Sequence, residues 1–388
     1  MKKLIILTIA LVAMFSMSVL ATETRVLTMG ENGTILVDDA NIWQFTGRFF
    51  NYPDLAIGEF SSMSSYDFPM FGMHFKFGEQ KPWVLGTYFT KEPFNGPQDY
   101  RGNSFGNFSQ LRSTNDRRVD LFYGRQFSQT NFGFRFGYLQ SSVEDDASGS
   151  QFKEAWSQYQ FDFGITDAAG KWDVAAMLAF GTWDDNTAAG ATETEPDGYV
   201  DFSAVARYIY EYDPKYTFVP HVGVAFGKHK EVDSLAGEFT DSKLTVLDAG
   251  VGMNYTPTRG VLAAFDFGFQ YRQVKNDRGT LGEQKWTDSY LPYWKIGMDA
   301  EVFNWMDVRL GATSFWANQK TENTVGPVES KIHTAMNNTY LGAGLHWGRL
   351  HIDTYTDPQI VLDGFNFISG SNDAEDLNFQ VSVLYEMF

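Results

Sequence analysis

The sequence predicts an all-β protein that crosses a membrane as an antiparallel up-and-down β-barrel of about 16 strands. Many segments alternate apolar and polar side chains with period two, and short turns alternate with long polar connections between them. Beyond residue 21, no segment offers the ~18 consecutive apolar residues of a membrane helix. The chain has 388 residues and no cysteine, which excludes disulfide scaffolds, thiolate metal sites and thiol catalysis.

The first 21 residues have the pattern of a secretory signal peptide. Lys2 and Lys3 form a basic start, Leu4–Ala13 is almost wholly apolar, and Val19 and Ala21 are small residues before the expected cleavage point. Removing two lysines from 30 basic residues leaves 28 against 48 acidic residues, a net charge of about −20. This balance disfavours nucleic acid and anionic lipid surfaces as partners. We expect secretion to the periplasm and residence in a bacterial outer membrane.

Two-faced strands then follow one another along the chain. In one of them Phe132, Phe134 and Phe136 share a face, and Arg135 lies on the other. Fifteen segments fit clearly, and an even number of strands is needed to place both chain termini on the periplasmic side, so Leu55–Ser61 is added as the sixteenth; 14 strands is the alternative. The expected strands are Leu55–Ser61, Phe71–Gly78, Trp83–Thr90, Arg118–Phe127, Phe132–Tyr138, Tyr159–Gly164, Trp172–Trp183, Tyr199–Tyr212, Tyr216–Lys228, Ser242–Thr256, Val261–Arg272, Ser289–Phe303, Met306–Trp316, Asn337–Gly348, Arg349–Tyr355 and Leu377–Phe388.

The connections fall into two classes that alternate strictly. Short ones such as Ser128–Thr130 and Asn304–Trp305 carry tight-turn residues. In a meander, this alternation places short periplasmic turns at one end and long outer loops at the other. The expected long loops are Lys91–Arg117, Ser142–Lys153, Asp184–Gly198, His229–Asp241, Lys275–Asp288, Ala317–Met336 and Thr356–Asp376, and within the last of them Pro358–Gly370 is expected to form a short helix or folded loop.

Charge distinguishes the two faces of the strands. The aromatic and aliphatic face is almost free of charge at mid-strand, so it should meet lipid, and eight tryptophans near strand ends fit interfacial girdles. A soluble β-sandwich, the alternative, would need shorter and more irregular edge strands. We expect the lumen to be lined by Lys76, Asp120, Arg135, Asp162, Asp173, Asp201, Arg207, Asp248, Asp266, Arg272, Lys295, Asp299, Arg309 and Asp353, with Asp307 and Glu386 as further acids. These charges suit a polar pore or, equally, paired charges that brace a plugged barrel.

Both ends of the mature chain carry a resemblance. Phe388, which closes the last strand, resembles the C-terminal signal that directs bacterial outer-membrane barrels to their assembly machinery, although Ser382 and Glu386 stand where that signal has apolar residues. Residues 25–55, with their Met-Gly segment and the acidic pair Asp38 and Asp39, are similar to the start of the long-chain fatty-acid transporter superfamily. This resemblance implies that residues 22–54 plug the barrel. The expected organisation is therefore a signal peptide (1–21), a periplasmic or plug segment (22–54) and a barrel (55–388).

Catalytic motifs are interpreted as accidental. Gly102–Gly106 spells G-x-S-x-G inside an expected loop, whereas a nucleophile elbow needs a strand before it and a helix after it. Gly342 and Gly344 lie in an alternating strand, where glycine allows neighbours to approach. His346 and His351 flank a tight turn near Asp353, a grouping that could bind zinc but that a polar lumen with six histidines produces by chance. We expect no enzyme activity, catalytic residue, metal or cofactor.

The expected function is a porin-like channel for passive diffusion of small polar solutes. Two outer loops, Asp184–Gly198 and Thr356–Asp376, hold five acids each and predict weak cation preference in an open pore. The alternatives are a hydrophobic-substrate transporter of the fatty-acid transporter type and a plugged barrel whose loops bind a surface or secretion partner. Expected partners are outer-membrane lipid, the barrel-assembly machinery and small solutes; the oligomeric state is not predicted.

Overall fold

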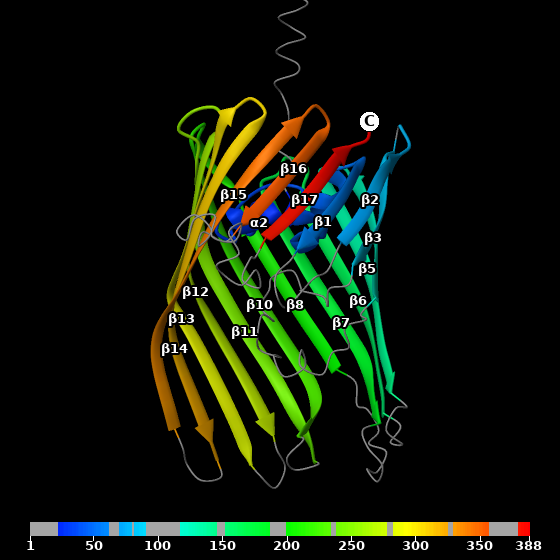
Figure 1. Cartoon of the computed structure of the whole chain (residues 1–388), viewed down its shortest axis with the longest axis vertical. Coiled ribbons are helices and arrows are strands. Elements are labelled where there is room, and N and C mark those ends of the chain that lie inside the picture. The colour runs from blue at the N-terminus through cyan, green and yellow to red at the C-terminus, as the bar shows by residue number, and fades with distance from the viewer. Residues whose placement is uncertain are drawn as a thin grey trace, which may run out of the picture.

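A single antiparallel sheet closes on itself to form the wall of the molecule (Figure 1). The computed structural model describes residues 22–61, 70–79, 81–90, 117–145, 152–186, 199–233, 238–277, 282–324, 329–356 and 379–388. Its strands are β1 (Leu55–Ser61), β2 (Met70–Phe77), β3 (Trp83–Thr90), β4 (Arg117–Phe127), β5 (Thr130–Asp145), β6 (Phe152–Asp167), β7 (Trp172–Asn186), β8 (Tyr199–Tyr208), β9 (Tyr210–Asp213), β10 (Tyr216–Asp233), β11 (Glu238–Tyr255), β12 (Val261–Asp277), β13 (Glu283–Phe303), β14 (Met306–Asn323), β15 (Glu329–Trp347), β16 (Leu350–Thr356) and β17 (Phe379–Glu386).

The barrel has 16 strands, as the parity argument predicted. β8 and β9 pair with the same neighbour, β10, and only Ile209 separates them, so they form one interrupted strand. Every other strand pairs with its sequence neighbours, and β1 pairs with both β2 and β17, which closes the ring. The predicted fold class is therefore confirmed.

The two kinds of connection lie at opposite ends of the barrel. Seven short turns lie at the end where β1 starts and where β17 ends (Figure 1). The connections at the other end lie wholly or largely outside the described residues, as do the signal-peptide segment, the Gly102–Gly106 motif and the Pro358–Gly370 segment. The acidic loops Asp184–Gly198 and Thr356–Asp376 also lie outside the described residues, except for their first residues.

Several expected loops are instead strand, which corrects the sequence-based boundaries. Half of the predicted loop Ser142–Lys153 and most of His229–Asp241, Lys275–Asp288 and Ala317–Met336 continue the ladders of β5/β6, β10/β11, β12/β13 and β14/β15. The reason is that a strand outside lipid keeps its backbone hydrogen bonds but needs no apolar face, so alternation disappears while the sheet continues. Opposite charges support the ladder there: Lys285 Nζ lies 3.5 Å from Glu322 Oε2 on the neighbouring strand.

The outward face carries the apolar side chains that alternation assigned to lipid. Phe71, Phe163, Phe267 and Leu310 are about half exposed although they lie within strands. Trp305, in a short turn, and Trp316, eleven residues further along β14, are also exposed. A tilted strand rising ~3.4 Å per residue places these two tryptophans roughly 28 Å apart along the barrel axis, close to the height of an outer-membrane apolar band.

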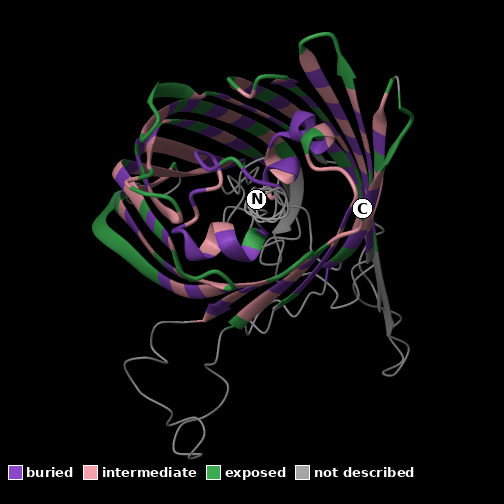
Figure 2. Ribbon diagram, turned by 90° about the horizontal axis from the view of Figure 1, so that it is seen from above, coloured by how far each residue is buried: buried purple, intermediate pink, exposed green. Residues whose placement is uncertain are grey.

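Residues 22–54, called the luminal segment below, lie inside the barrel (Figure 2), near its turn end (Figure 1). The segment forms two short α-helices, α2 (Glu23–Thr28) and α3 (Asn41–Gln44), and the 3-10 helix η1 (Thr46–Asn51). Helix α2 packs against β14–β17, and η1 packs against β3–β7. Among the described residues, no helix is both long enough and apolar enough to cross a membrane.

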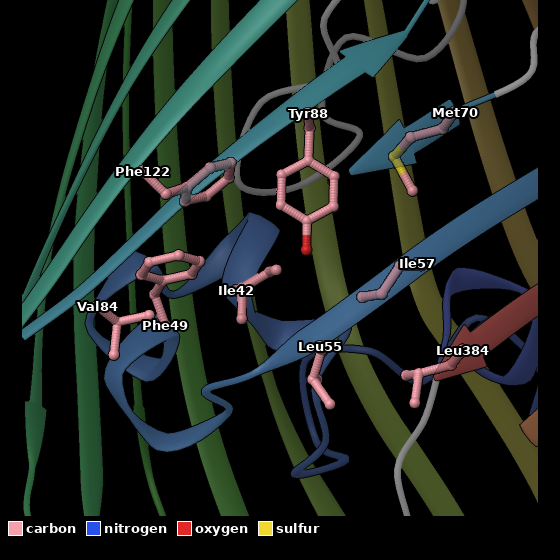
Figure 3. Packing of buried hydrophobic residues seen from close by; sticks show 9 residues of the cluster. All are labelled: Ile42, Phe49, Leu55, Ile57, Met70, Val84, Tyr88, Phe122 and Leu384. Carbon is pink, nitrogen blue, oxygen red and sulfur yellow. The ribbon is translucent and has the colours of Figure 1, made fainter. Parts of the chain in front are cut away.

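The core of the molecule lies between the luminal segment and the wall. Ile42 and Phe49 of the segment pack against inward residues of β1–β4 and β17, and Figure 3 shows the nine side chains of this cluster: Ile42, Phe49, Leu55, Ile57, Met70, Val84, Tyr88, Phe122 and Leu384. A second cluster joins Met29, Ile35 and Leu36 to the wall at Val219 and Ala264. Each fully buried apolar side chain of this kind stabilises the packed arrangement by about 1.5–3 kcal/mol.

The last strand explains the irregular C-terminal pattern. Ser382 and Leu384 of β17 are fully buried and face inward, while Tyr385 and Phe379 face outward and are exposed. The polar residues at Ser382 and Glu386 thus occupy luminal positions. Phe388 lies beyond the end of β17 and is 83% exposed; its role as an assembly signal stays a prediction.

Candidate functional site: the luminal segment and its seat

The fourteen charged residues expected in the lumen differ in their exposure. Arg272 and Lys295 are half-buried, and Lys76 is exposed at the turn end. The buried ones are Asp120, Arg135, Asp162, Asp173, Asp201, Arg207, Asp248, Asp266, Asp299, Arg309 and Asp353. Five of the buried acids form ion pairs with buried arginines: Asp120, Asp162, Asp173, Asp299 and Asp353. These pairs form three separate networks and not one charged ring.

One network lies on β4–β6. Arg118 makes two hydrogen bonds of 2.7 Å to the carboxylate of Asp120. Arg135 donates to Asp120 at 2.9 Å and to Asp162 at 3.1 Å. The Arg135 guanidinium also lies 4.6 Å from the ring centre of Trp43 in the luminal segment, a cation–π contact that a desolvated site strengthens. The wall thus holds this part of the segment through an aromatic ring.

A second network joins the segment to β7 and β8. Asp173 accepts bonds from Arg48 of the luminal segment at 2.8 and 2.9 Å and from Arg207 of the wall at 2.6 Å. Arg207 also donates to the carbonyl oxygens of Thr34 at 2.7 Å and Leu36 at 2.6 Å. One wall arginine therefore binds both the backbone of the segment and the carboxylate that pairs with Arg48.

A third network holds α2 on the opposite side of the lumen. Arg25 donates to Asp299 at 2.9 Å and to Asp38 at 3.3 Å, so it joins the wall and the segment. Arg309 pairs with Asp299 at 3.2 Å and with Asp353. All of these side chains are at least nine-tenths buried. Buried pairs of this kind are costly to break, because the remaining charge has no water to solvate it.

The backbone of the luminal segment packs directly against inward glycines of the wall, called the glycine seats below: Gly133, Gly164, Gly297 and Gly311. A Cβ atom on Gly133 of β5 would overlap with the carbonyl oxygen of Thr46, and one on Gly164 of β6 would overlap with the backbone nitrogen of Gly47. Across the lumen, Gly297 and Gly311 meet the backbone of residues 28–30 in the same way. Because backbone touches backbone at these places, the wall admits no side chain there.

Gly342 and Gly344 confirm the interpretation that glycine allows a close approach. A Cβ atom on Gly342 would overlap with the side chain of Thr28 in α2, and one on Gly344 with the guanidinium of Arg309. The two glycines therefore serve packing in this strand.

The two histidines near the turn end do not join Asp353. His346 Nε2 lies 2.6 Å from Asp307 Oδ2, and His346 Nδ1 lies 2.8 Å from His351 Nδ1. Asp353 instead accepts hydrogen bonds from Arg309 and from Thr22 Oγ1, the latter at 2.8 Å. Among the described residues, no group of three His, Asp or Glu side chains is arranged to hold a metal ion.

The lumen on the loop side of the segment has an apolar wall, which the charge pattern did not reveal. Ala225, Leu244, Val246 and Val274 are buried inward residues of β10–β12, and Trp286 of β13 packs against them. Nearby on β13 and β14, the Tyr290 and Tyr293 rings lie 5.8 and 6.0 Å from that of Phe315. The expected charged residues are therefore only part of the lining, because apolar residues also occupy inward positions of β10–β14.

Sequence reasoning missed the partners that the luminal segment supplies. Arg25 and Arg48 complete two of the networks, and Glu59 and His74 are buried inward residues that were left out of the lumen list. The inward glycines were a usable signal, since they alternate with outward phenylalanines in stretches such as 132–137. The sequence alone does not show that these glycines contact the backbone of the luminal segment.

Comparison with known proteins gave distant similarities. No protein-family model matches the chain, and no curated protein does. Among solved structures, CdiB from Escherichia coli aligns with a TM-score of 0.46 and 9% identity over 86% of this chain and 63% of its own. The Pseudomonas putida toluene transporter TodX aligns with a TM-score of 0.41 and 9% identity over 96% and 99% of the two chains. The chain spans 63% and 59% of the CdiB chains from E. coli and Acinetobacter baumannii.

The fold itself rests on the geometry of this chain. The sheet closes through the β1–β17 pairing, the outward face is an exposed apolar belt, and the inward face holds the buried charges. The chain is a closed 16-stranded antiparallel β-barrel of the kind found in bacterial outer membranes.

Proposed function

We propose that the chain is a transport protein of the bacterial outer membrane whose luminal segment closes the barrel at its turn end. One observation carries the proposal: the segment is bonded to two separated parts of the wall, through Arg25 to Asp299 on β13 and through Arg48 to Asp173 on β7. A solute crossing the barrel must then displace part of this segment. The proposal involves no enzymatic step and takes secretion to the periplasm and insertion by the assembly machinery as its route.

The apolar wall supports a hydrophobic or amphipathic solute. A ligand pocket for such a molecule is lined mainly by apolar and aromatic side chains with a few polar groups. Val246, Val274, Trp286 and Phe315 provide side chains of this kind on the loop side of the segment. The loose resemblance of residues 25–55 to the fatty-acid transporter superfamily points in the same direction.

Conductance of the reconstituted mature chain tests the closed state. We expect planar bilayers with the mature chain (residues 22–388) to show little current, and a variant lacking residues 22–54 to show stable steps, because a 16-stranded barrel without the segment encloses an aqueous channel. A parent chain that conducts as well as the deletion variant would refute closure by the segment.

Binding of a small aromatic dye tests the solute class. We expect N-phenylnaphthylamine to bind the detergent-solubilised mature chain, and Val274→Asp to weaken binding about tenfold, because a carboxylate in the apolar wall is poorly solvated. Val222→Asp, on the exposed lipid face, is the matched control and should bind in detergent like the parent. Equal affinity of the parent and Val274→Asp would argue against this wall as the site.

A porin-like channel for small polar solutes is the second candidate. The half-buried Arg272 and Lys295 favour it, since they place charge on the lumen face. Its weak cation preference depends on acidic outer loops that lie outside the described residues. Strong conductance of the parent, with permeation of small sugars, would favour this candidate over a closed transporter.

A further inference from the structure

The barrel closes through a short ladder. Within the part of the chain that the structure describes, β1 and β17, the first and last strands, share seven residue pairs, from Leu55↔Glu386 to Ser61↔Gln380. The neighbouring ladders are as short, with seven pairs between β16 and β17 and five between β1 and β2, whereas β10 and β11 share eighteen. Each ladder pair contributes hydrogen bonds and cross-strand contacts, so the closing seam has less of both than the long strands have.

The luminal segment bridges this seam from inside. Glu59 of β1 and Ser382 of β17 lie directly opposite each other across the seam, and both are buried. Ser382 Oγ donates to Glu59 Oε1 at 2.7 Å, and the same oxygen accepts the backbone N–H of Glu23 at 3.0 Å. The hydroxyl of Thr24 bonds that of Ser382. The start of α2 is thus hydrogen-bonded to both strands of the seam.

The bridge extends to the neighbouring strand and to the apolar core. Thr22 Oγ1 donates to Asp353 on β16 at 2.8 Å, so three consecutive residues contact three adjacent strands. Further along the segment, Ile42 belongs to the cluster that contains Ile57 and Leu384, which form another directly opposed pair of the seam (Figure 3). Hydrogen bonds and apolar contacts therefore both cross the β1–β17 junction from the luminal side.

We propose that the luminal segment has a second function, as an internal clasp that closes the barrel: residues 22–24 and Ile42 hold the first and last strands together. Closure during assembly then depends on docking of the segment. This function goes beyond transport and does not rest on it. It also gives the polar residue at Ser382 a purpose, since an apolar side chain at this luminal position would lose the bonds to Glu59 and Thr24.

A disulfide across the seam tests the clasp. The natural chain has no cysteine, so a Gly58→Cys/Val383→Cys pair gives one defined crosslink. These residues are directly opposed, face away from the segment, and leave ordinary space for a Cβ atom at Gly58. In the full-length protein extracted from membranes, we expect Glu59→Ala combined with Thr24→Val to lower the temperature at which the folded electrophoretic band disappears by about 5 °C. Oxidation of the cysteine pair should restore most of this loss.

Asn254→Ala is the matched control, because it also removes a hydrogen bond between wall and segment, from Asn254 Nδ2 to the Ile35 carbonyl at 2.8 Å on β11, away from the seam. Its loss of stability should not be restored by the seam disulfide. An unchanged transition temperature in the Glu59→Ala/Thr24→Val variant, or equal restoration of both variants, would overturn the clasp.

A milder substitution, Glu59→Gln, provides a second test if the Glu59→Ala/Thr24→Val variant does not fold. Glu59→Gln keeps the side-chain shape but weakens the charge-assisted bonds. Expressed with the cysteine pair, it should give a lower yield of the crosslink in membranes than the parent with the same pair. Equal yields would overturn the dependence of closure on the segment.

Discussion

Arg207 illustrates how a single residue joins the wall to the luminal segment. Its guanidinium bonds Asp173, two backbone carbonyl oxygens and the Asn41 side chain, and it lies 4.2 Å from the ring centre of Phe45. An arginine suits this place because its planar fork offers five donors and it keeps its charge when buried.

Replacing Arg207 by methionine should therefore cost roughly 3–5 kcal/mol of unfolding free energy, because Asp173 and two carbonyl oxygens lose a buried donor. The measurement is thermal loss of the folded electrophoretic band. Lys215→Gln, at an exposed turn, should leave the transition unchanged. An Arg207→Met protein as stable as its parent would contradict the view that this network holds the segment.

The buried carboxyl of Asp38 should make the stability of the folded protein depend on pH. Burial raises the pKa of its carboxyl above the usual value, and the nearby Arg25 and Arg207 offset only part of this rise. One of its oxygens, Oδ1, has no hydrogen-bond partner among the described residues. Because the folded pKa lies above the unfolded one, Asp38 favours the folded state most below the unfolded pKa, and this contribution is lost as the pH rises through the folded pKa.

The Asp38→Asn variant removes this titration. We expect its transition temperature, relative to that of the parent, to increase between pH 4 and pH 8. A difference that stays constant or decreases over this range would show that the ion pair with Arg25 outweighs burial.

At the scale of elements, the glycine seats decide how closely η1 approaches the wall. Gly133 and Gly164 face the backbone of Thr46 and Gly47 from two adjacent strands. The strands themselves tolerate alanine at these positions, because inward Cβ atoms are common in barrels. The steric overlap of an added Cβ atom is therefore with the luminal segment.

We expect Gly133→Ala to leave the barrel folded but to displace η1. The expected result is ionic current through planar bilayers with little change in the folded band, since the ladder of β5 is kept. Gly58→Ala, where a Cβ atom meets only ordinary contacts at 3.6 Å or more, is the control and should stay closed. Loss of the folded band in Gly133→Ala alone would mean that the seat supports the wall as well.

The sequence predicted the elements well wherever lipid imposes alternation. Inward Arg135 and Asp162 and outward Phe134 and Phe163 follow from period two alone. The outer halves of β14 and β15 were not predicted, because a strand with polar residues on both faces has the same sequence pattern as a polar loop. The pairing of Asp299 with Arg25 and of Asp173 with Arg48 was equally hidden, since these partners lie 274 and 125 residues apart in sequence.

At the scale of the whole molecule, charge balance links closure to selectivity. The luminal segment supplies Arg25 and Arg48, which partly neutralise Asp299 and Asp173. Residues 22–54 carry five acids and two arginines, so removing them leaves 43 acidic against 26 basic residues in residues 55–388, and Asp299 and Asp173 keep only their wall arginines.

The barrel lacking residues 22–54 should therefore prefer cations. The preference should be weak and should fade with salt, because the Debye length falls from ~8 Å at physiological ionic strength to ~3 Å at 1 M. The reversal potential in a tenfold KCl gradient measures it. A potential of the sign that indicates anion preference would contradict the prediction.

The glycine seats also have a genetic consequence. Every amino-acid replacement at a glycine codon adds at least a Cβ atom, so Gly133, Gly164, Gly297 and Gly311 have no conservative substitute. Their neighbours on the lipid face accept many apolar residues. Mutational tolerance along β5, β6, β13 and β14 should thus itself alternate with period two, and the intolerant positions would trace the path of the luminal segment on the wall.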